Sequence, residues 1–300
     1  MAEITRRRTG EFLQELFRLL LLNNRVLPAK EAILGVEKKF KLSDYELGEF
    51  PSGGRRFDYI LRFSTVDCVK AGWLQKHKGK WILTDEGAQA LEKYADPEAF
   101  YREAVRLYQV WKKSQPGDGS DDSVEQPDAT PTPEGKTANI TYEEAEEHAW
   151  EEIRKYVGAL PPYDFQDMVA SLLKALGYHV TWIAPPGKDG GIDVLAWSDP
   201  LGVKPPRVKV QVKRQQAKVS VEGLRSFLAV LGEEDVGIFV CTGGFTKDAE
   251  DEARTQEKRK ISLVDLERFV DMWTDNYPRL EDAAKRKLPL QPIWFLAPME

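Results

Sequence analysis

The 300-residue sequence is poor in the residues and runs that build disulfides, zinc sites and membrane spans. It has two cysteines, Cys68 and Cys241, and three histidines. Both cysteines lie in apolar stretches and the histidines lack metal-ligand spacing, so we expect neither a disulfide nor a zinc site. Apolar runs such as Leu19–Leu22 are far shorter than the roughly 20 residues of a membrane span. We therefore expect a cytoplasmic protein that makes no membrane contact.

Several motifs of catalysis and phosphate binding are also missing. The sequence has no Walker motif, no G-x-G-x-x-G that opens a helix after a strand, and no Ser or Cys nucleophile elbow. These absences predict that the protein uses no nucleotide cofactor and no covalent serine or cysteine chemistry.

The net charge of −6 is unevenly distributed along the chain. Six basic residues and no acid lie between Pro200 and Val221, and four lysines and no acid lie between Lys70 and Lys80. Local fields, rather than net charge, attract a polyanion. Each segment fits either a nucleic-acid contact or an ordinary solvated basic face.

The composition changes abruptly between Ser114 and Gly135. This stretch holds six acids, four prolines and no base. It cannot bury enough apolar surface to offset its ordering entropy, which predicts a flexible linker. We expect a first domain at residues 1–112, a linker at 113–136 and a second domain at 137–300.

The first domain has the pattern of a winged helix. Amphipathic helices are predicted at residues 11–22, 28–40 and 56–71, with Gly72 ending the third. Strands at 73–76 and 80–83 then flank a short basic turn, and Thr84 caps a last helix. In a winged helix the third helix commonly enters the major groove and the hairpin contacts the backbone. A fold of this kind also serves protein contacts or dimerisation, which is the alternative interpretation.

The second domain begins with a helix. Thr141 and Glu144 form a capping box, and Gly158 ends the helix. Its predicted inward residues are Tyr142, Ala145, Ala149, Ile153 and Tyr156. The following segments predict the order α-β-β-β-α-β-α-β, with a helix at 164–176 and strands at 178–183, 192–197, 207–213, 236–242 and 261–264. That order gives an α/β (α+β) fold with a mixed sheet.

Two of these strands carry the candidate chemistry. Asp193 heads an apolar run, and Val208, Val210 and Val212 alternate with Lys209, Gln211 and Lys213. Because strand side chains alternate between faces, Gln211 and Lys213 lie opposite the valines. If the strands pair, an acid, an amide and an ammonium meet at one edge of a sheet. Phosphodiester hydrolysis uses such a group: oxygen ligands for a divalent cation and a lysine beside the attacking water. The alternatives are a turn-forming aspartate and a solvated edge lysine.

These motifs resemble the PD-(D/E)XK nuclease superfamily, and in particular the Mrr-type restriction endonucleases. The resemblance takes in DGGID at 189–193, QVK at 211–213, TGGFT at 242–246 and the N-terminal pattern at 69–91. It implies an N-terminal winged helix, a restriction-endonuclease-like core and Mg²⁺, with Mn²⁺ as a substitute. It also implies that Asp193 is a metal ligand, with Gln211 and the Val212 carbonyl as weaker ones, and that Lys213 orients the water.

Three further features concern this site. The position that carries a glutamate in many relatives is Gln166 here, which leaves an acid-poor site. Asp189 is the best second acid and equally fits a turn aspartate. The glycines of Thr242–Thr246 allow either an approach to a phosphate or a simple tight turn.

The resemblance implies an endonuclease that cuts double-stranded, modified foreign DNA. Cutting both strands needs two sites, so a homodimer or higher assembly is expected. The expected DNA contacts are Arg55, Arg56, Arg62, Lys76, Lys78, Lys80, Lys209 and Arg214. Two alternatives stay open: a non-cleaving DNA-binding sensor on the same core, and a nuclease that protein partners recruit.

Overall fold

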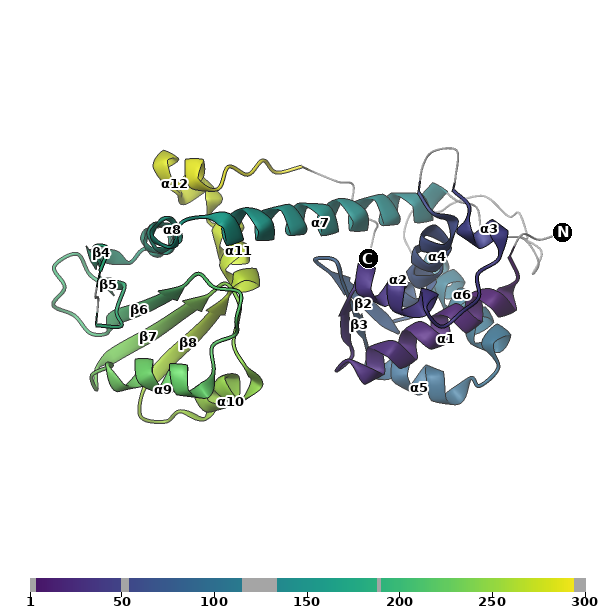
Figure 1. Cartoon of the computed structure of the whole chain (residues 1–300), viewed down its shortest axis with the longest axis horizontal. Helices are drawn as coiled ribbons and strands as arrows, with labels where there is room; N and C mark the ends of the chain where they lie inside the picture. The colour runs from purple at the N-terminus through teal and green to yellow at the C-terminus, as the bar shows by residue number, and fades with distance from the viewer. Residues whose placement is uncertain (1–3, 50–53, 115–133, 188–189, 294–300) are drawn as a thin grey trace. The chain divides into compact units, whose positions relative to one another are not determined.

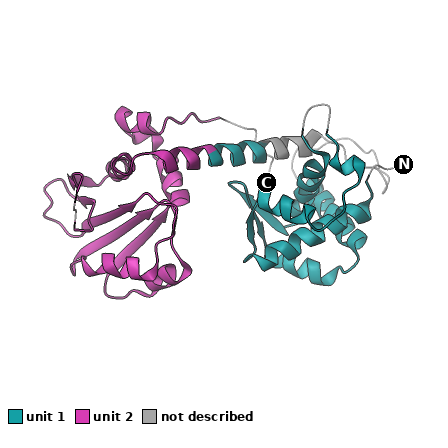
Figure 2. Cartoon of the chain, in the orientation of Figure 1, with its two compact units in different colours: residues 1–151, 294–300 teal, residues 152–293 magenta. Residues whose placement is uncertain are grey.

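The computed structural model describes residues 4–49, 54–114, 134–187 and 190–293 of the chain. Contacts divide the chain into two compact units, one ending at Glu151 and the other spanning Glu152–Ile293 (Figure 2). The division falls inside one long helix, α7 (Glu134–Ala159). No helix within the described ranges is both long enough and apolar enough to cross a membrane.

The first unit is a three-stranded sheet with helices packed around it (Figure 1). Its elements are α1 (Arg6–Leu22), β1 (Val26–Pro28), α2 (Ala29–Glu37), α3 (Asp44–Leu47), α4 (Arg56–Lys70), β2 (Leu74–His77), β3 (Lys80–Leu83), α5 (Asp85–Lys93), α6 (Pro97–Ser114) and the first part of α7. The strand order is β1-β3-β2, with both pairs antiparallel. The predicted helix-then-hairpin order of a winged helix is therefore present in α4, β2 and β3.

Aromatic side chains fill the core of this unit. Phe12 of α1 meets Phe57 of α4 edge-on at 5.1 Å, and Phe17 meets Phe100 of α6 at 5.3 Å. Helix α6 was not predicted from the sequence, although Phe100 and Ala104 on its inner face are fully buried. Packing of this apolar stripe is what joins α6 to the unit.

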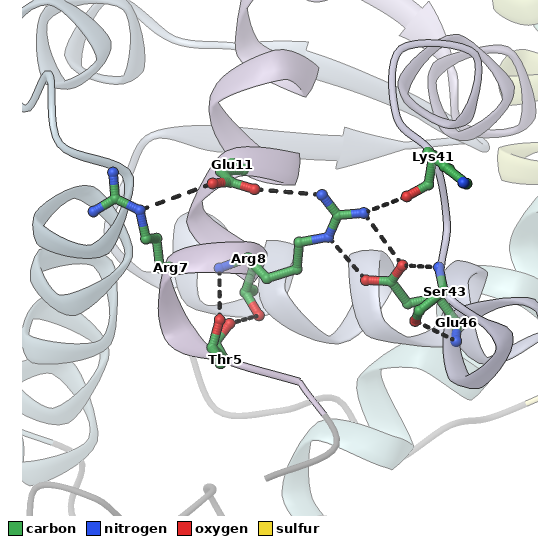
Figure 3. A network of polar contacts seen from close by, with 8 residues as sticks. Thr5, Arg7, Arg8, Glu11, Lys41, Ser43 and Glu46 are labelled. Carbon is green, nitrogen blue, oxygen red and sulfur yellow. Dashed lines mark hydrogen bonds and ion pairs between the residues drawn. The ribbon is translucent and has the colours of Figure 1, made fainter.

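A polar network fixes α3, a second element that was not predicted from the sequence (Figure 3). The Arg8 guanidinium donates to Glu46 from Nε at 2.9 Å. Glu46 also accepts from the Ser43 backbone N–H at 2.7 Å, which closes a capping box. Burial opposes the Glu46 charge, but the bonds from Arg8 and Ser43 outweigh it and lower the pKa of this carboxyl.

The second unit is built on a five-stranded sheet. Its elements are the end of α7, α8 (Pro162–Ala175), β4 (His179–Ile183), β5 (Val194–Trp197), β6 (Arg207–Lys213), α9 (Val221–Ala229), β7 (Asp235–Cys241), α10 (Lys247–Thr255), β8 (Lys260–Asp265), α11 (Leu266–Asp275), a 3₁₀ turn (Tyr277–Arg279) and α12 (Asp282–Lys287). The strand order is β4-β5-β6-β7-β8. β4, β5 and β6 pair antiparallel, whereas β6, β7 and β8 pair parallel. The mixed sheet that the sequence predicts is confirmed.

Helices cover both faces of this sheet. On one face Phe239 of β7 packs edge-on against Phe227 of α9 and against Phe245, at 5.2 and 5.6 Å. On the other face Phe165 of α8 meets Phe269 of α11 at 5.1 Å. The two aromatic clusters hold β6 between them, because its side chains alternate toward either face.

Helix α7 differs from the predicted helix in its start and in its buried face. It begins at Glu134, so Thr141 lies inside it. Tyr142 and Tyr156, which the pattern places inward, are 44% and 43% exposed, whereas Glu143 and Glu147 are buried. Most of the predicted linker lies outside the described residues. Residues 137–151, which the sequence assigns to the second domain, pack within the first unit.

Candidate active site

Asp193 lies immediately before β5, where three strands meet. Its backbone N–H donates to the Val210 carbonyl of β6 at 2.8 Å, and its carbonyl accepts from the Ala184 N–H at 2.8 Å. Its side chain is buried, and Oδ2 accepts from the Val212 N–H at 2.7 Å. Oδ2 therefore holds the carboxylate against β6, in an orientation that the neighbouring strand sets.

Gln211 and Lys213 of β6 lie on the same face of the sheet as Asp193. The register pairs Val194 with Val210, which puts Asp193 opposite Gln211 in the antiparallel ladder. Side chains that are opposite one another point to the same side of a sheet. The Lys213 ammonium lies 5.5 Å from the centre of the Phe239 ring, on the side to which Gln211 also points. The predicted acid, amide and ammonium are thus brought to one sheet face.

Gln166 supports this arrangement from α8. Its side chain is buried, and its amide Nε2 donates to the Ala184 carbonyl at 2.9 Å. Ala184 in turn bonds the backbone of Asp193, so Gln166 contacts the segment that holds the acid. The described contact is a structural one, made by the amide nitrogen.

The two remaining candidate ligands are Val212 and Asp189. Val212 contacts Asp193 through its N–H, whereas the sequence suggested a part for its carbonyl. Asp189 lies outside the described residues. In the part of the chain that the structure describes, no group of three or more His, Cys, Asp or Glu side chains is arranged to hold a metal ion.

The turn at Thr242–Thr246 anchors the end of β6 just beyond Lys213. The Thr242 N–H donates to the Lys213 carbonyl at 3.0 Å, and its hydroxyl bonds both backbone groups of Gln215. A Cβ on Gly243 would lie 2.4 Å from the Ala217 carbonyl oxygen. This face of the turn meets carbonyl oxygens, which repel anions, so the geometry favours the tight-turn interpretation over a phosphate contact.

Lys209 belongs to the opposite end of β6. Its ammonium donates to the Val230 carbonyl at 2.6 Å and lies 2.8 Å from Asp235. Asp235 also accepts from Arg207 and from the Gly232 N–H. Burial opposes ionisation of Asp235, but the bonds from Arg207 and Lys209 outweigh it and lower its pKa far below the usual range. Lys209, which the sequence predicts to contact DNA, is thus paired with Asp235 and largely buried.

Arg214 is also engaged within the second unit. Its guanidinium donates to the Gly158 carbonyl at 2.6 Å, in the last turn of α7. On α8, Asp164 and Asp167 both pair with Lys287 of α12, at 3.0 and 2.8 Å. Helix α8 begins at Pro162, two residues before the predicted start, so Asp164 lies in its first turn. No sequence signal pointed to Lys287, because its partners are more than a hundred residues away.

In the first unit, the two expected DNA contacts at the start of α4 are both engaged. Arg55 bonds Glu37 at 2.7 and 3.2 Å. The Arg56 guanidinium lies 4.6 Å from the Tyr45 ring centre, in a cation–π contact. Lys80 begins β3 and faces His77 in the hairpin ladder.

The three remaining contacts expected here lie against α7. Arg62 is buried and bonds Glu143 and Glu147 at 2.9 and 2.7 Å. Lys76 bonds Glu143, and Lys78 lies 5.4 Å from the Trp150 ring centre. Burial opposes the Arg62 charge, but the two carboxylates outweigh it and raise its pKa, whereas burial lowers the pKa of Lys76. The sequence did not predict that Glu143 and Glu147 are buried, because a hydrophobic pattern assigns charged residues to the exposed face.

The arrangement in the second unit offers the kinds of group that phosphodiester hydrolysis uses. The Asp193 carboxylate offers charged oxygens, one of which accepts from the Val212 N–H, and the Gln211 amide offers a neutral oxygen. Mg²⁺ takes oxygen ligands and is commonly held by one or two carboxylates together with substrate phosphates. A lysine on the same face supplies positive charge where a pentavalent phosphorus develops negative charge.

Two family models match the chain in the same places. A model described as restriction endonuclease, for the Mrr catalytic domain, matches residues 157–273. The Mrr N-terminal domain matches residues 11–93. The first match contains Asp193, Gln211 and Lys213, and the second contains α4 and the hairpin.

Similar proteins are found among curated sequences and solved structures. The chain is 29% identical over 212 residues to the type IV methyl-directed restriction enzyme EcoKMrr of Escherichia coli (strain K12), across 66% of this chain and 68% of that enzyme. The MspJI restriction endonuclease, solved in complex with a 27-mer oligonucleotide, gives a TM-score of 0.32 at 16% identity, over 70% of this chain and 52% of that one. The DNA modification-dependent restriction endonuclease AspBHI gives 0.36 at 15% identity, over 72% and 58%. The chain thus spans a little over half of each solved chain.

Proposed function

This chain belongs to the Mrr-type restriction endonucleases and is a DNA endonuclease, and from that premise we propose that Asp193, Gln211 and Lys213 form its cutting site. The observation that carries the proposal is the bond from the Val212 N–H to Asp193 Oδ2 at 2.7 Å. It fixes a carboxylate opposite Gln211, which is itself two residues from Lys213, within the matched catalytic domain.

Restriction endonucleases of this family generally use divalent metal ions. We propose Mg²⁺, with Mn²⁺ as a substitute, held by Asp193 and Gln211. The donor chemistry fits, because both residues offer oxygen and Mg²⁺ keeps several waters in such sites. The ion would supply a Lewis acid for the phosphate oxygens. The Val212 carbonyl and Asp189 are further candidate ligands that the resemblance suggests.

The chain's own residues would perform the rest of the chemistry. Asp193, held by Val212, would supply a negative charge whose orientation is fixed before the substrate arrives. The Lys213 ammonium would hold the attacking water by a hydrogen bond and offset the negative charge that develops on the phosphorus. Gln166 would act at one remove, because it positions the backbone beside Asp193. Packing of the Lys213 side chain against Phe239 would limit its motion.

The substrate that we propose is double-stranded foreign DNA that carries modified, in particular methylated, bases. The support is the 29% identity of the chain to the E. coli relative, which is a methyl-directed restriction enzyme. The first unit would select the DNA, and the second would cut it. A homodimer or higher assembly would supply the two sites that double-strand cleavage needs.

The acid-poor site favours a second candidate, a protein that binds DNA without cutting it. Of the two candidate metal ligands within the described residues, Asp193 contributes a negative charge. Gln211 is a neutral amide and contributes none. A site with one described carboxylate would bind Mg²⁺ weakly until DNA phosphates add ligands.

One experiment separates the two candidates. Purified full-length protein is incubated with methylated and unmethylated plasmid in Mg²⁺, Mn²⁺ or EDTA. The proposal predicts linear or nicked product with either metal, more from methylated plasmid, and none in EDTA. Binding without cleavage under every condition would favour the non-cleaving candidate. Equal cleavage of both plasmids would remove the methylated-DNA proposal and leave the nuclease.

A further inference from the structure

Residues 142–151 of α7 lie against a set of basic residues that the winged-helix unit gathers from four places. They are Lys30 of α2, Arg62 of α4, Lys76 of β2 and Lys78 of the hairpin tip, which we call the basic surface. Figure 2 shows this part of α7 as belonging to the first unit. Three of the four residues are those that the sequence predicts to contact DNA.

Carboxylates of α7 occupy this surface in a regular line. Glu143 accepts from Arg62 at 2.9 Å, from Lys76 at 2.5 Å and from the Trp81 indole N–H at 2.7 Å. Glu147 accepts from Arg62 at 2.7 Å, and Glu151 pairs with Lys30 at 2.9 Å. Because the three glutamates are four residues apart, they form one stripe with a spacing of about 6 Å. A row of negative charges thus runs along the basic surface.

The contact buries no apolar side chain fully, although Ala145 and Trp150 are half-buried. Between residues 142 and 151, the buried side chains are Glu143 and Glu147. Tyr142 is exposed, and Ala149 is exposed as well. A helix that is a permanent part of a domain ordinarily packs an apolar stripe into the core. This part of α7 is held instead by ion pairs, whose two sides both regain water when they separate.

The hairpin tip is shaped to this helix. Gly79 has a positive φ of 70°, and a Cβ there would lie 2.7 Å from Glu147 Cγ. The glycine therefore lets the basic tip approach α7 closely. The same absence of a side chain would let the tip approach a phosphate backbone.

We propose that the basic surface is the polyanion-binding surface of this unit, and that α7 occupies it in place of DNA. DNA then binds there only when α7 leaves, with phosphates replacing the carboxylates of Glu143, Glu147 and Glu151. This inference rests on the proposed role of the first unit in binding DNA. When the competent form is a small fraction of the molecules, the apparent affinity falls by that fraction.

The test is binding of a fluorescently labelled duplex to the full-length protein in EDTA, so that no cutting occurs. The variant Glu143→Gln/Glu147→Gln removes two competing charges while it keeps shape and partial hydrogen bonding. The matched control is Glu146→Gln/Glu152→Gln, which removes the same charge from less buried positions of the same helix. We expect the first variant to bind DNA about tenfold tighter or more, and the control to change affinity less than about twofold.

A second measurement on the unchanged protein guards against a variant that folds poorly. Hydrogen exchange of the α7 amides at residues 143–151 is compared with and without duplex. The inference predicts faster exchange when DNA binds, because α7 loses its contacts. Unchanged or slower exchange with DNA bound would overturn it, as would equal or weaker binding by a folded Glu143→Gln/Glu147→Gln variant.

Plasmid cleavage in Mg²⁺ is followed in parallel to separate the two proposals. Cleavage and DNA binding with α7 still protected would remove the α7 inference and keep the nuclease. If the chain neither binds duplex nor cuts plasmid, the proposed function falls and this inference falls with it.

Discussion

Replacing Asp235 with asparagine tests how the strand that carries Gln211 and Lys213 is fixed at its far end. Asp235 opens β7 and meets the start of β6, where it accepts from Arg207 Nε at 2.8 Å, from the Gly232 N–H at 2.6 Å and lies 2.8 Å from Lys209 Nζ. Its carboxylate is almost fully enclosed. The asparagine of the variant would keep the side-chain shape but lose the charge that both cations require.

The magnitude follows from the exposure of the partners. Breaking a fully buried pair costs about 3–5 kcal/mol, because a charge stays behind without its partner. The Arg207 side chain is 40% exposed and can be solvated, whereas that of Lys209 is 12% exposed and cannot. We therefore expect about 3 kcal/mol, at the low end of that range. The pKa of Asp235 is lower in the folded protein than in the unfolded one, so this stabilisation is present above about pH 4. It declines as the pH falls further, toward the folded pKa.

The assay is hydrogen exchange of the β6 and β7 amides in the full-length protein, which reports the local opening free energy. A loss of about 3 kcal/mol would lower protection about a hundredfold. The control is Asp282→Asn, which removes the same charge from an exposed pair with Lys285 and is expected to cost less than about 1 kcal/mol. Similar effects of the two variants at pH 7 would refute the reasoning, as would a difference that persists undiminished at low pH.

Two further predictions concern the site itself. Gln211→Glu adds a carboxylate opposite Asp193, so the Mg²⁺ concentration for half-maximal cleavage should fall; an unchanged requirement would mean that Gln211 is not a ligand. Gly243→Ala places a Cβ 2.4 Å from the Ala217 oxygen and should cost about 1–3 kcal/mol in urea unfolding. By contrast, Gly158→Ala meets open space in α7 and should stabilise by up to about 1 kcal/mol. Equal effects of the two alanines would contradict the role given to Gly243.

The central strand, β6, could be predicted well from the sequence for a physical reason. The alternation of Val208, Val210 and Val212 with polar residues has one solution, a strand with the valines inward, and β6 has the predicted bounds. The same alternation put Lys209 on the face of Gln211 and Lys213. The alternation does not show how far apart these lysines lie, which is four residues of strand, or about 13 Å. It also does not show that Asp235 lies beside Lys209 and pairs with it.

The misassigned face of α7 has the opposite cause. Hydrophobic periodicity selects Tyr142 and Tyr156 as inward residues, yet the buried positions are glutamates. Their partners, Arg62 and Lys76, lie more than sixty residues earlier in the chain, so no local pattern reveals them. The predicted capping box at Thr141 is wrong, because the helix begins at Glu134 and continues through that position. Ion pairs with residues far away in the sequence therefore determine which face of α7 is buried, and local periodicity does not reveal them.

Cleavage by the Asp193→Asn and Lys213→Met variants, measured in single turnover with DNA already bound, tests the proposed cutting site most directly. The asparagine can still accept from the Val212 N–H but loses the metal-binding charge. The methionine can still pack on Phe239 but loses the ammonium. We predict that each variant binds duplex with nearly the affinity of the unchanged protein and cuts it at least about a hundredfold more slowly. Cleavage by either variant within a few-fold of the unchanged rate would place the chemistry elsewhere.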